Sequence, residues 1–294
     1  MGSISEKYRS ILPEMIRNCT QSQTITGHNV FQPGNMKNRP HVDKVVEDHL
    51  LPGSGIIDVQ HLEELHRLSR DGKSCLILME HYSNFDIPAF IYLLGKSGPR
   101  GKDAAEAIVS MAGLKLNVEN PAVHAFSEAY SRIVIYPSRY HDSITDPEKL
   151  KEERKKSNVI NRAALHEMIR CKHSGNIILV FPSGTRYRPG KPDTKRGLKE
   201  IDSYIKVFDY MVFIGSGGNI LRIHPSGEMA EDLLVQDRVV FKVSPVMDCQ
   251  EFRDRARAEA PADADHKLFT VQRVMEELDK LHIEVRKIRG GGED

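Results

Sequence analysis

Short apolar runs alternate with longer amphipathic stretches from about residue 57 to the end of the chain. Runs of roughly four to seven β-branched or aliphatic residues are typical of strands buried on both faces of a sheet. They are CLILM (75–79), AIVSMA (107–112), RIVIYP (132–137), NIILVF (176–181), NILRIHP (219–225) and RVVFKV (238–243). With helices between them, these runs predict an α/β fold: a mixed, largely parallel sheet covered by helices on both faces.

The helical stretches complete the predicted organisation. Apolar positions at helical spacing predict amphipathic helices at 58–72, 84–98, 146–175 and about 266–289. Before the first strand, the pattern predicts one helix from Ser5 to Asn18 and a second, short helix within 41–55. We therefore predict a small helical N-terminal module at 1–55 and an α/β domain at 56–294.

The composition excludes several classes of protein. Of 294 residues, 39% are apolar and 28% are charged, and the net charge of +1 gives no overall attraction to nucleic acid. No apolar run approaches the roughly 20 residues that span a bilayer, and the N-terminus lacks a signal-peptide core. The four cysteines form no CxxC pair, so no zinc site or disulfide framework is indicated. We expect a soluble cytoplasmic protein without a metal or cofactor.

The first candidate site follows the strand at 75–79, because parallel sheets carry their sites at the carboxyl ends of strands. There, His81 leaves the strand and Asp86 opens the next helix, so that the carboxylate can orient the imidazole as a base. The same His-x4-Asp spacing at His66 and His141 falls on a helix and in a polar loop. An alternative interpretation is that His81 and Ser83 only cap the helix, with Asp86 serving its dipole.

Two further strand ends carry cations. The turn after 176–181 contains small residues and two arginines: Ser183, Gly184, Thr185, Arg186 and Arg188. Between Pro182 and Lys199 there are six cations and one acid, which favours an anionic ligand, although a solvated basic loop would also explain the charge. Arg139 and His141 follow the strand at 132–137, where a surface arginine is the simpler alternative. Together the three strand ends predict a site for an anionic substrate that loses a proton.

These motifs resemble those of the glycerolipid acyltransferase superfamily. EHYSNFD (80–86) resembles its NHxSxxD block, FPSGTR (181–186) its FPEGTR block, and IVIYPSR (133–139) an intervening block that ends in arginine. Glu80 stands where the family has asparagine, and Ser183 stands where it has glutamate. PSGTRYRP (182–189) is similar to PSGGRDRP of the soluble, plastid-type glycerol-3-phosphate acyltransferases.

The resemblance implies transfer of a fatty acyl group from a thioester to the sn-1 hydroxyl of glycerol 3-phosphate, giving lysophosphatidate. It implies His81 as general base, oriented by Asp86, with the substrate phosphate held by Arg139, His141, Arg186 and Arg188. Ser83, Ser183, Gly184 and Thr185 are candidates for supporting the oxyanion.

We expect the acyl donor to be acyl carrier protein or coenzyme A, either of which would dock on the basic stretch 186–199. The resemblance to the soluble enzymes favours acyl carrier protein. Peripheral contact with a membrane is compatible with the substrates, and no nucleic-acid partner is expected. The alternatives are a 1-acylglycerol-3-phosphate acyltransferase, a non-catalytic phosphate- or lipid-binding protein, and a hydrolase.

Overall fold

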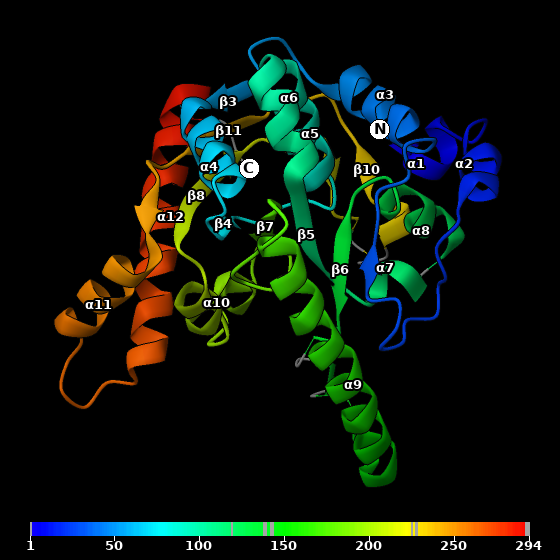
Figure 1. Ribbon diagram of the computed structural model, residues 1–294. Helices are drawn as coiled ribbons and strands as arrows, with labels where there is room; N and C mark the ends of the chain where they lie inside the picture. Colours follow the sequence, from blue (N-terminus) through cyan, green and yellow to red (C-terminus); the bar gives the residue numbers. More distant parts are fainter. Residues whose placement is uncertain are drawn as a thin grey trace.

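A mixed sheet forms the centre of the structure, which is a computed structural model (Figure 1). The structure describes residues 2–118, 120–137, 140–141, 144–224, 226 and 229–291. Over these residues the main sheet has nine strands in the order β2-β6-β5-β7-β4-β8-β11-β3, with β12 also paired to β8. Their bounds are β2 Phe31–Gln32, β3 Gly55–Ile57, β4 Cys75–Met79, β5 Ile108–Gly113, β6 Arg132–Ile135, β7 Ile177–Val180, β8 Tyr210–Gly217, β11 Val240–Val243 and β12 Met247–Asp248.

The central strands β6, β5, β7, β4 and β8 run parallel to one another. Strand β3 is parallel to β11, whereas β2, β11 and β12 each pair antiparallel with a central strand. This arrangement confirms the predicted fold class. Because the central strands are parallel, the turns that follow β4, β6 and β7 all lie at one edge of the sheet.

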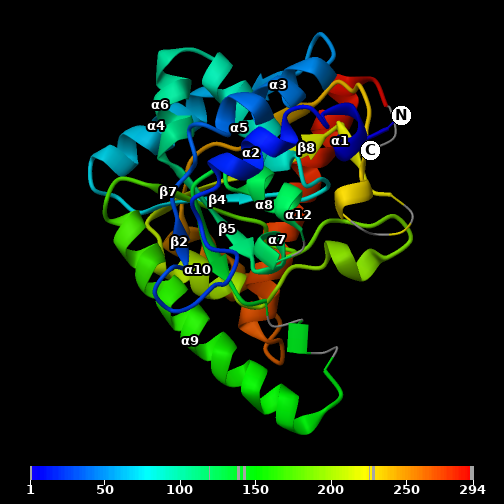
Figure 2. The same ribbon diagram turned by 90° about the vertical axis from the view of Figure 1, so that its right-hand side faces the viewer.

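Helices cover both faces of this sheet. The alternation along β4 shows why: Cys75, Ile77 and Met79 pack under α3, α4, α5, α6 and α8, whereas Leu76 and Leu78 pack under α9, α10, α11 and α12. The helices are α1 Ile4–Lys7, α2 Leu12–Asn18, α3 Arg39–His49, α4 Gln60–Arg70, α5 Asp86–Lys96, α6 Pro99–Ala107, α7 Lys115–Val118, α8 Pro121–Ser127, α9 Pro147–Lys172, α10 Ile201–Val207, α11 Cys249–Glu259 and α12 His266–Arg289. Figures 1 and 2 show the N-terminal half of α9 projecting beyond the other helices.

Most predicted elements are confirmed, and two are wrong. The helix predicted from Ser5 to Asn18 is two helices, α1 and α2, because Pro13 lies in the first turn of α2 and cannot continue a preceding helix. The strand predicted at 219–225 is reduced to β9 (Leu221–Arg222), which lies outside the main sheet. It forms a small antiparallel sheet with β10 (Leu233–Leu234) and β1 (Gly2–Ser3).

The sequence pattern also missed strand β8, which pairs with β4 at the centre of the sheet. Its second half contains Gly215 and Gly217, residues that normally mark a turn. The structure gives the reason for Gly215: a Cβ atom there would lie 2.6 Å from Leu281 Cβ of α12. The glycine lets a long helix pack directly on the strand.

The N-terminal segment joins the rest of the chain through Glu128, a fully buried carboxylate just after α8. Its Oε1 atom accepts hydrogen bonds from Thr20 N (2.8 Å), Thr20 Oγ1 (3.1 Å) and Asn35 Nδ2 (2.9 Å). Burial alone would raise the pKa of Glu128, but the bonds from His124, Thr20 and Asn35 outweigh it and lower that pKa from 4.5 to about 2. Figure 2 shows α2 beside α8, where this contact lies. The domain boundary at residue 55 stays a prediction.

Replacing Glu128 with glutamine tests this attachment. A carboxylate whose pKa is lowered by folding stabilises the protein above its unfolded pKa, and that stabilisation is lost as the pH falls towards its folded pKa. We therefore expect Glu128→Gln to lower the free energy of unfolding by about 2–3 kcal/mol at pH 7, with the difference from wild type shrinking between pH 5 and 2. Denaturant unfolding at several pH values measures the free energy of unfolding of each protein and how the difference between them changes with pH. A difference that does not change with pH would contradict the assignment.

Candidate active site

One carboxylate oxygen organises the turn between β4 and α5. Asp86 Oδ2 accepts hydrogen bonds from His81 Nδ1 (2.9 Å), Tyr82 N (2.7 Å) and Ser83 N (2.9 Å). Since a carboxylate oxygen only accepts, His81 Nδ1 carries a proton, and in the neutral ring Nε2 is then the nitrogen with a lone pair. Asp86 is buried and His81 is partly buried, and His81 lines the cavity described below.

The helix-cap interpretation of this turn describes only part of it. Ser83 Oγ accepts a hydrogen bond from Phe85 N (3.1 Å) and donates to Leu221 O (3.0 Å). Ser83 therefore holds the start of α5 and ties it to β9. Both its N–H and its hydroxyl are engaged within the turn, so in this conformation it supports the shape of the site rather than pointing a donor into it.

The second predicted motif lies directly against the first. The ring of Phe181, which follows β7, stacks on the His81 ring at 3.9 Å between centroids and 10° between planes. The backbone N of Tyr187 donates to His81 O (2.8 Å). These contacts arise because β4 and β7 are parallel neighbours, with Leu78 opposite Val180. The sequence marked the turn from Phe181 to Gly184 as a candidate for supporting the oxyanion, but it gave no sign that Phe181 stacks on His81 or that Tyr187 bonds to it.

The turn that follows Phe181 is tight and internally bonded. Gly184 N donates to Phe181 O (2.9 Å), and Ser183 Oγ donates to Thr185 O (2.8 Å). Gly184 has a φ of +63°, and a Cβ atom there would lie 2.4 Å from Leu198 Cδ1, so only glycine fits without strain. Gly184 and Thr185 both line the cavity described next, which places this turn beside His81.

His81 borders a cavity of about 950 Å³. This volume is near the upper end of the range of about 300–1,000 Å³ that small-molecule sites occupy. Its walls come from both faces of the sheet and are mainly apolar. On one side they are Ala164, Leu165 and Met168 of α9 and Ile201 and Tyr204 of α10; on the other they are Phe85, Ile87, Pro88, Val123 and Phe126. A long apolar chain fits such a site.

The two predicted arginines of the second motif have different surroundings. Arg188 lines the cavity, and its backbone N donates to Thr194 Oγ1 (2.9 Å). Arg186 is buried, and its Nη1 lies 2.5 Å from Asp232 Oδ2. Burial raises the pKa of the Asp232 carboxyl, and the Arg186 guanidinium opposes that rise. In this conformation Arg186 holds the turn after β7 in place through its ion pair with Asp232, whereas Arg188 lines the cavity.

Asp232 is a site residue that the sequence analysis missed. Besides Arg186, it accepts hydrogen bonds from Asn84 Nδ2 (3.2 Å) and His224 N (3.1 Å). It thereby joins the turn after β4, the turn after β7 and the segment after β9. No local pattern marks it, because its partner Asn84 is 148 residues away in the sequence.

The third predicted motif is described only in part. Arg139 lies outside the described residues. Tyr136, Pro137 and Tyr140 line the cavity, and the His141 ring stacks on Tyr136 at 5.4 Å between centroids. Among the described residues, His141 Nε2 is buried and has no hydrogen-bond partner. Tyr140 of this motif therefore lines the same cavity as His81 and Arg188, whereas His141 is not among the residues that line it.

Within the described residues, one group of three side chains has the composition of a metal site: Cys19, His124 and Glu128. The Nε2 atom of His124 lies 3.3 Å from Glu128 Oε2 and 3.2 Å from Gln21 O. Burial raises the pKa of the Cys19 thiol to about 12, with the Glu128 charge adding to the effect. A protonated thiol and a hydrogen-bonded carboxylate form a structural network between the N-terminal segment and α8.

The histidine of a histidine–carboxylate pair and an arginine thus line one mainly apolar cavity, an arrangement compatible with acyl transfer. A comparison with protein families agrees: the acyltransferase family model matches residues 56–212, just over half of the chain. The chain belongs to the acyltransferase family. A search of curated proteins finds no match. The helices of the described part of the chain are all too short or too polar to cross a bilayer.

An asparagine at position 86 tests the central pair. Asp86→Asn keeps the size of the side chain but can present an amide to His81, which favours the wrong tautomer. We expect the acyl-transfer rate to fall about 10²–10⁴-fold, the range found for such pairs. The matched control is Asp71→Asn, which changes the carboxylate of the His66-x4-Asp71 repeat, where Asp71 pairs with Arg67 on the surface. Equal activity of the two variants would rule out the pair as the catalytic unit.

Proposed function

We propose that this acyltransferase moves a fatty acyl group from a thioester to the sn-1 hydroxyl of glycerol 3-phosphate. The observation that carries the proposal is that His81 and Arg188 line the same, mainly apolar cavity. The cavity suits the acyl chain, and the arginine suits a phosphate. The resemblance of residues 182–189 to the soluble, plastid-type enzymes favours this acceptor.

In the proposed reaction, His81 Nε2 removes the proton of the substrate hydroxyl as its oxygen attacks the thioester carbonyl. A carbon–oxygen bond forms and the carbon–sulfur bond breaks, and the proton on His81 passes to the leaving thiolate. Asp86 accepts from His81 Nδ1 throughout and stabilises the imidazolium that forms between the two steps. Thr185 lines the cavity beside His81 and would support the oxyanion, while Gly184, whose N–H is bonded to Phe181 O, shapes the turn that presents it.

For the phosphate, we propose Arg188 as the principal ligand, joined by His141 and Arg139 from the turn after β6. Arg186 would contribute through its ion pair with Asp232, which holds the loop that carries Arg188. Fixing the phosphate also orients the hydroxyl towards His81. The loss of Arg188 should therefore affect turnover as well as binding.

The proposed donor is acyl carrier protein or coenzyme A, either of which would dock on the basic stretch 186–199. Leu165 and Val207 line the cavity but are 49% and 41% exposed, so apolar side chains lie at its rim. Such a rim would let a lipid product leave towards a membrane surface. We therefore propose a cytoplasmic enzyme with peripheral membrane contact and no other cofactor.

A second candidate function is acylation of 1-acylglycerol 3-phosphate. The cavity favours it in one respect, because its apolar walls come from both faces of the sheet. A chain on the acceptor could lie against α5 and α8 while the donor chain lies against α9 and α10. The two functions share the roles of His81, Asp86 and Arg188.

The acceptor is tested with radiolabelled acyl carrier protein and acyl-coenzyme A, each supplied with glycerol 3-phosphate, with 1-acylglycerol 3-phosphate or with water alone. We expect lysophosphatidate that requires glycerol 3-phosphate and is lost in His81→Ala. Transfer only to 1-acylglycerol 3-phosphate would establish the second candidate. Thioester cleavage that ignores both acceptors would indicate a hydrolase, and no reaction would indicate a binding protein.

Removing the Arg188 side chain tests the phosphate assignment. A hydrogen bond to a charged group contributes about 1.5–3 kcal/mol, so we expect Arg188→Ala to raise the KM for glycerol 3-phosphate by roughly 10- to 100-fold and to lower kcat. Arg70→Ala, on the exposed face of α4, serves as the matched control. An unchanged KM in Arg188→Ala would place the phosphate elsewhere.

A further inference from the structure

A second imidazole–carboxylate pair lies directly beside the catalytic pair. Glu80, the residue before His81, has its Oε2 atom 3.1 Å from His282 Nδ1 of α12. The hydroxyl of Tyr82 donates to Glu80 Oε1 (3.1 Å), and the Tyr82 ring stacks on His282 at 5.3 Å between centroids. Glu80 is 5% exposed and His282 is 9% exposed. Together with Ser216 of β8, these three residues form what we call the Glu80 cluster.

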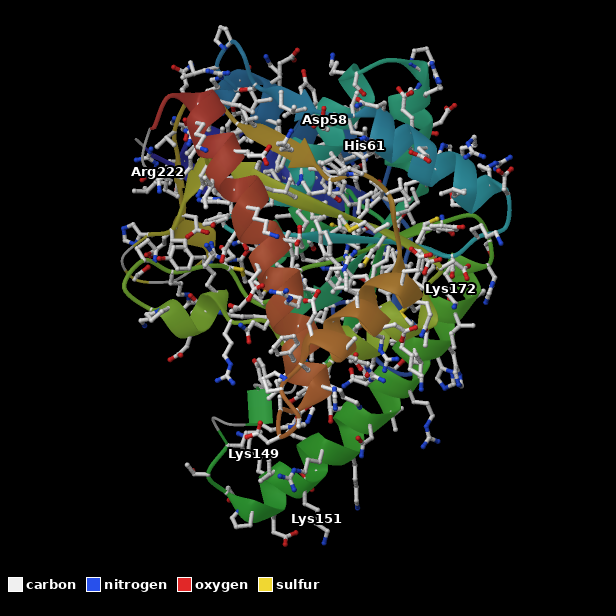
Figure 3. All side chains as sticks on the ribbon, turned by 90° about the vertical axis from the view of Figure 1, so that its left-hand side faces the viewer. Asp58, His61, Lys149, Lys151, Lys172 and Arg222 are labelled. Atoms are coloured by element: carbon white, nitrogen blue, oxygen red, sulfur yellow. The ribbon has the colours of Figure 1, made fainter. Side chains whose placement is uncertain are left out.

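The fold builds this cluster where α12 meets β8. Figure 3 shows α12 lying across the sheet on this side of the molecule. The helix comes close because Gly215 has no side chain, and the next residue, Ser216, donates its N–H to Glu80 Oε2 (2.9 Å). His282 Nδ1 is also 3.0 Å from Ser216 O. Because the carbonyl and the carboxylate can only accept, His282 Nδ1 carries the proton that they share.

Tyr82 connects this cluster to the catalytic pair. Its side chain contacts both Glu80 and His282, while its backbone N donates to Asp86 Oδ2 at 2.7 Å. That hydrogen bond is one of the three that fix Asp86 Oδ2 against His81 Nδ1. A displacement of Tyr82 therefore changes the hydrogen bonding of the carboxylate that orients the base.

We propose that His282 is a positioning residue for His81, acting through Glu80 and Tyr82. His282 touches neither His81 nor Asp86 in any hydrogen bond of the described residues, and it lies 70 residues beyond the last residue of the family match (282 against 212). Its Nδ1–H holds Glu80, and Glu80 in turn accepts the hydrogen bond that holds Tyr82. Tyr82 N then stays on Asp86. This inference rests on the proposed role of His81 as general base.

Two substitutions separate the hydrogen bond from the ring. His282→Asn places an amide N–H near the position of Nδ1 but removes the ring, whereas His282→Phe keeps a ring but removes the hydrogen bond. We expect His282→Phe to lower kcat about 5- to 20-fold with each KM within twofold of wild type, and His282→Asn to retain at least half of kcat. In a His81→Ala background, His282→Phe should cause no further loss, since its effect passes through His81.

The matched control is His61→Ala. His61 Nδ1 contacts the backbone carbonyl of Val243 (3.3 Å), so it too is a partly buried histidine bonded to a strand next to β8. Figure 3 labels it on α4, near one end of this face. Its removal should leave kcat and KM within twofold of wild type. If His61→Ala lowered kcat as much as His282→Phe does, the loss in His282→Phe would reflect a general loss of stability on removing a buried histidine. That result would overturn the proposal.

Hydrogen exchange gives a readout that does not depend on the acceptor. We expect the Tyr82 and Ser83 amides to exchange at least fivefold faster in His282→Phe, with wild-type rates in His282→Asn and His61→Ala. Unchanged exchange in a folded His282→Phe, or faster exchange with unchanged kcat, would overturn the proposal. If the wild-type protein acylates neither acceptor, the proposed function is wrong. Hydrogen exchange still tests the inference in that case: unchanged exchange of the Tyr82 and Ser83 amides in His282→Phe would show that the Glu80 cluster does not hold Tyr82.

A second variant covers the case in which His282→Phe does not fold. Tyr82→Phe removes only the hydroxyl that donates to Glu80 Oε1. We expect it to lower kcat about two- to fivefold and to accelerate exchange of the Ser83 amide, without a change in either KM. Wild-type kcat in this variant would overturn the proposal.

Discussion

The site depends on a single oxygen atom, Asp86 Oδ2, which accepts one hydrogen bond from His81 and two from the backbone of the same turn. A carboxylate bonded in this way has one orientation, and it gives the imidazole one tautomer and one direction. The rest of the site is arranged around this turn: Phe181 stacks on the ring, Ser83 ties the turn to β9, and Tyr82 ties it to Glu80 and His282. Tyr82 and Ser83 affect His81 through Asp86, whereas Phe181 contacts the ring directly.

The parallel sheet explains why groups from distant parts of the chain meet here. Strands β4, β6 and β7 end at one edge, so the turns that carry His81, Tyr140 and Arg188 border one cavity. The helices on the two faces then supply its apolar walls. The proposed transfer of a fatty acyl group to glycerol 3-phosphate needs this combination, because the proposed donor carries a long apolar chain and the proposed acceptor carries a phosphate. Membership of the acyltransferase family agrees with the arrangement.

The sequence predicts much of this, and its failures have physical causes. Strand ends and periodic apolar positions predict the fold class and the pair His81 and Asp86, because both depend on neighbours in the sequence. Asp232 and His282 were missed because their partners are 148 and 202 residues away, and no short pattern records such contacts. Arg186 was predicted as a ligand for phosphate from its position, but the sequence could not show that a buried Asp232 would pair with it. Strand β8 was missed because Gly215, which lets α12 approach, has the pattern of a turn.

The most direct measurement is the tautomer of His81 by nitrogen-15 NMR, with the His81 signal identified by its loss in His81→Ala. We expect the neutral ring to carry its proton on Nδ1, with Nε2 unprotonated, and Asp86→Asn to abolish this preference. A neutral wild-type ring with its proton on Nε2 would contradict the proposed role of His81, because that nitrogen could not then accept the proton of a substrate hydroxyl.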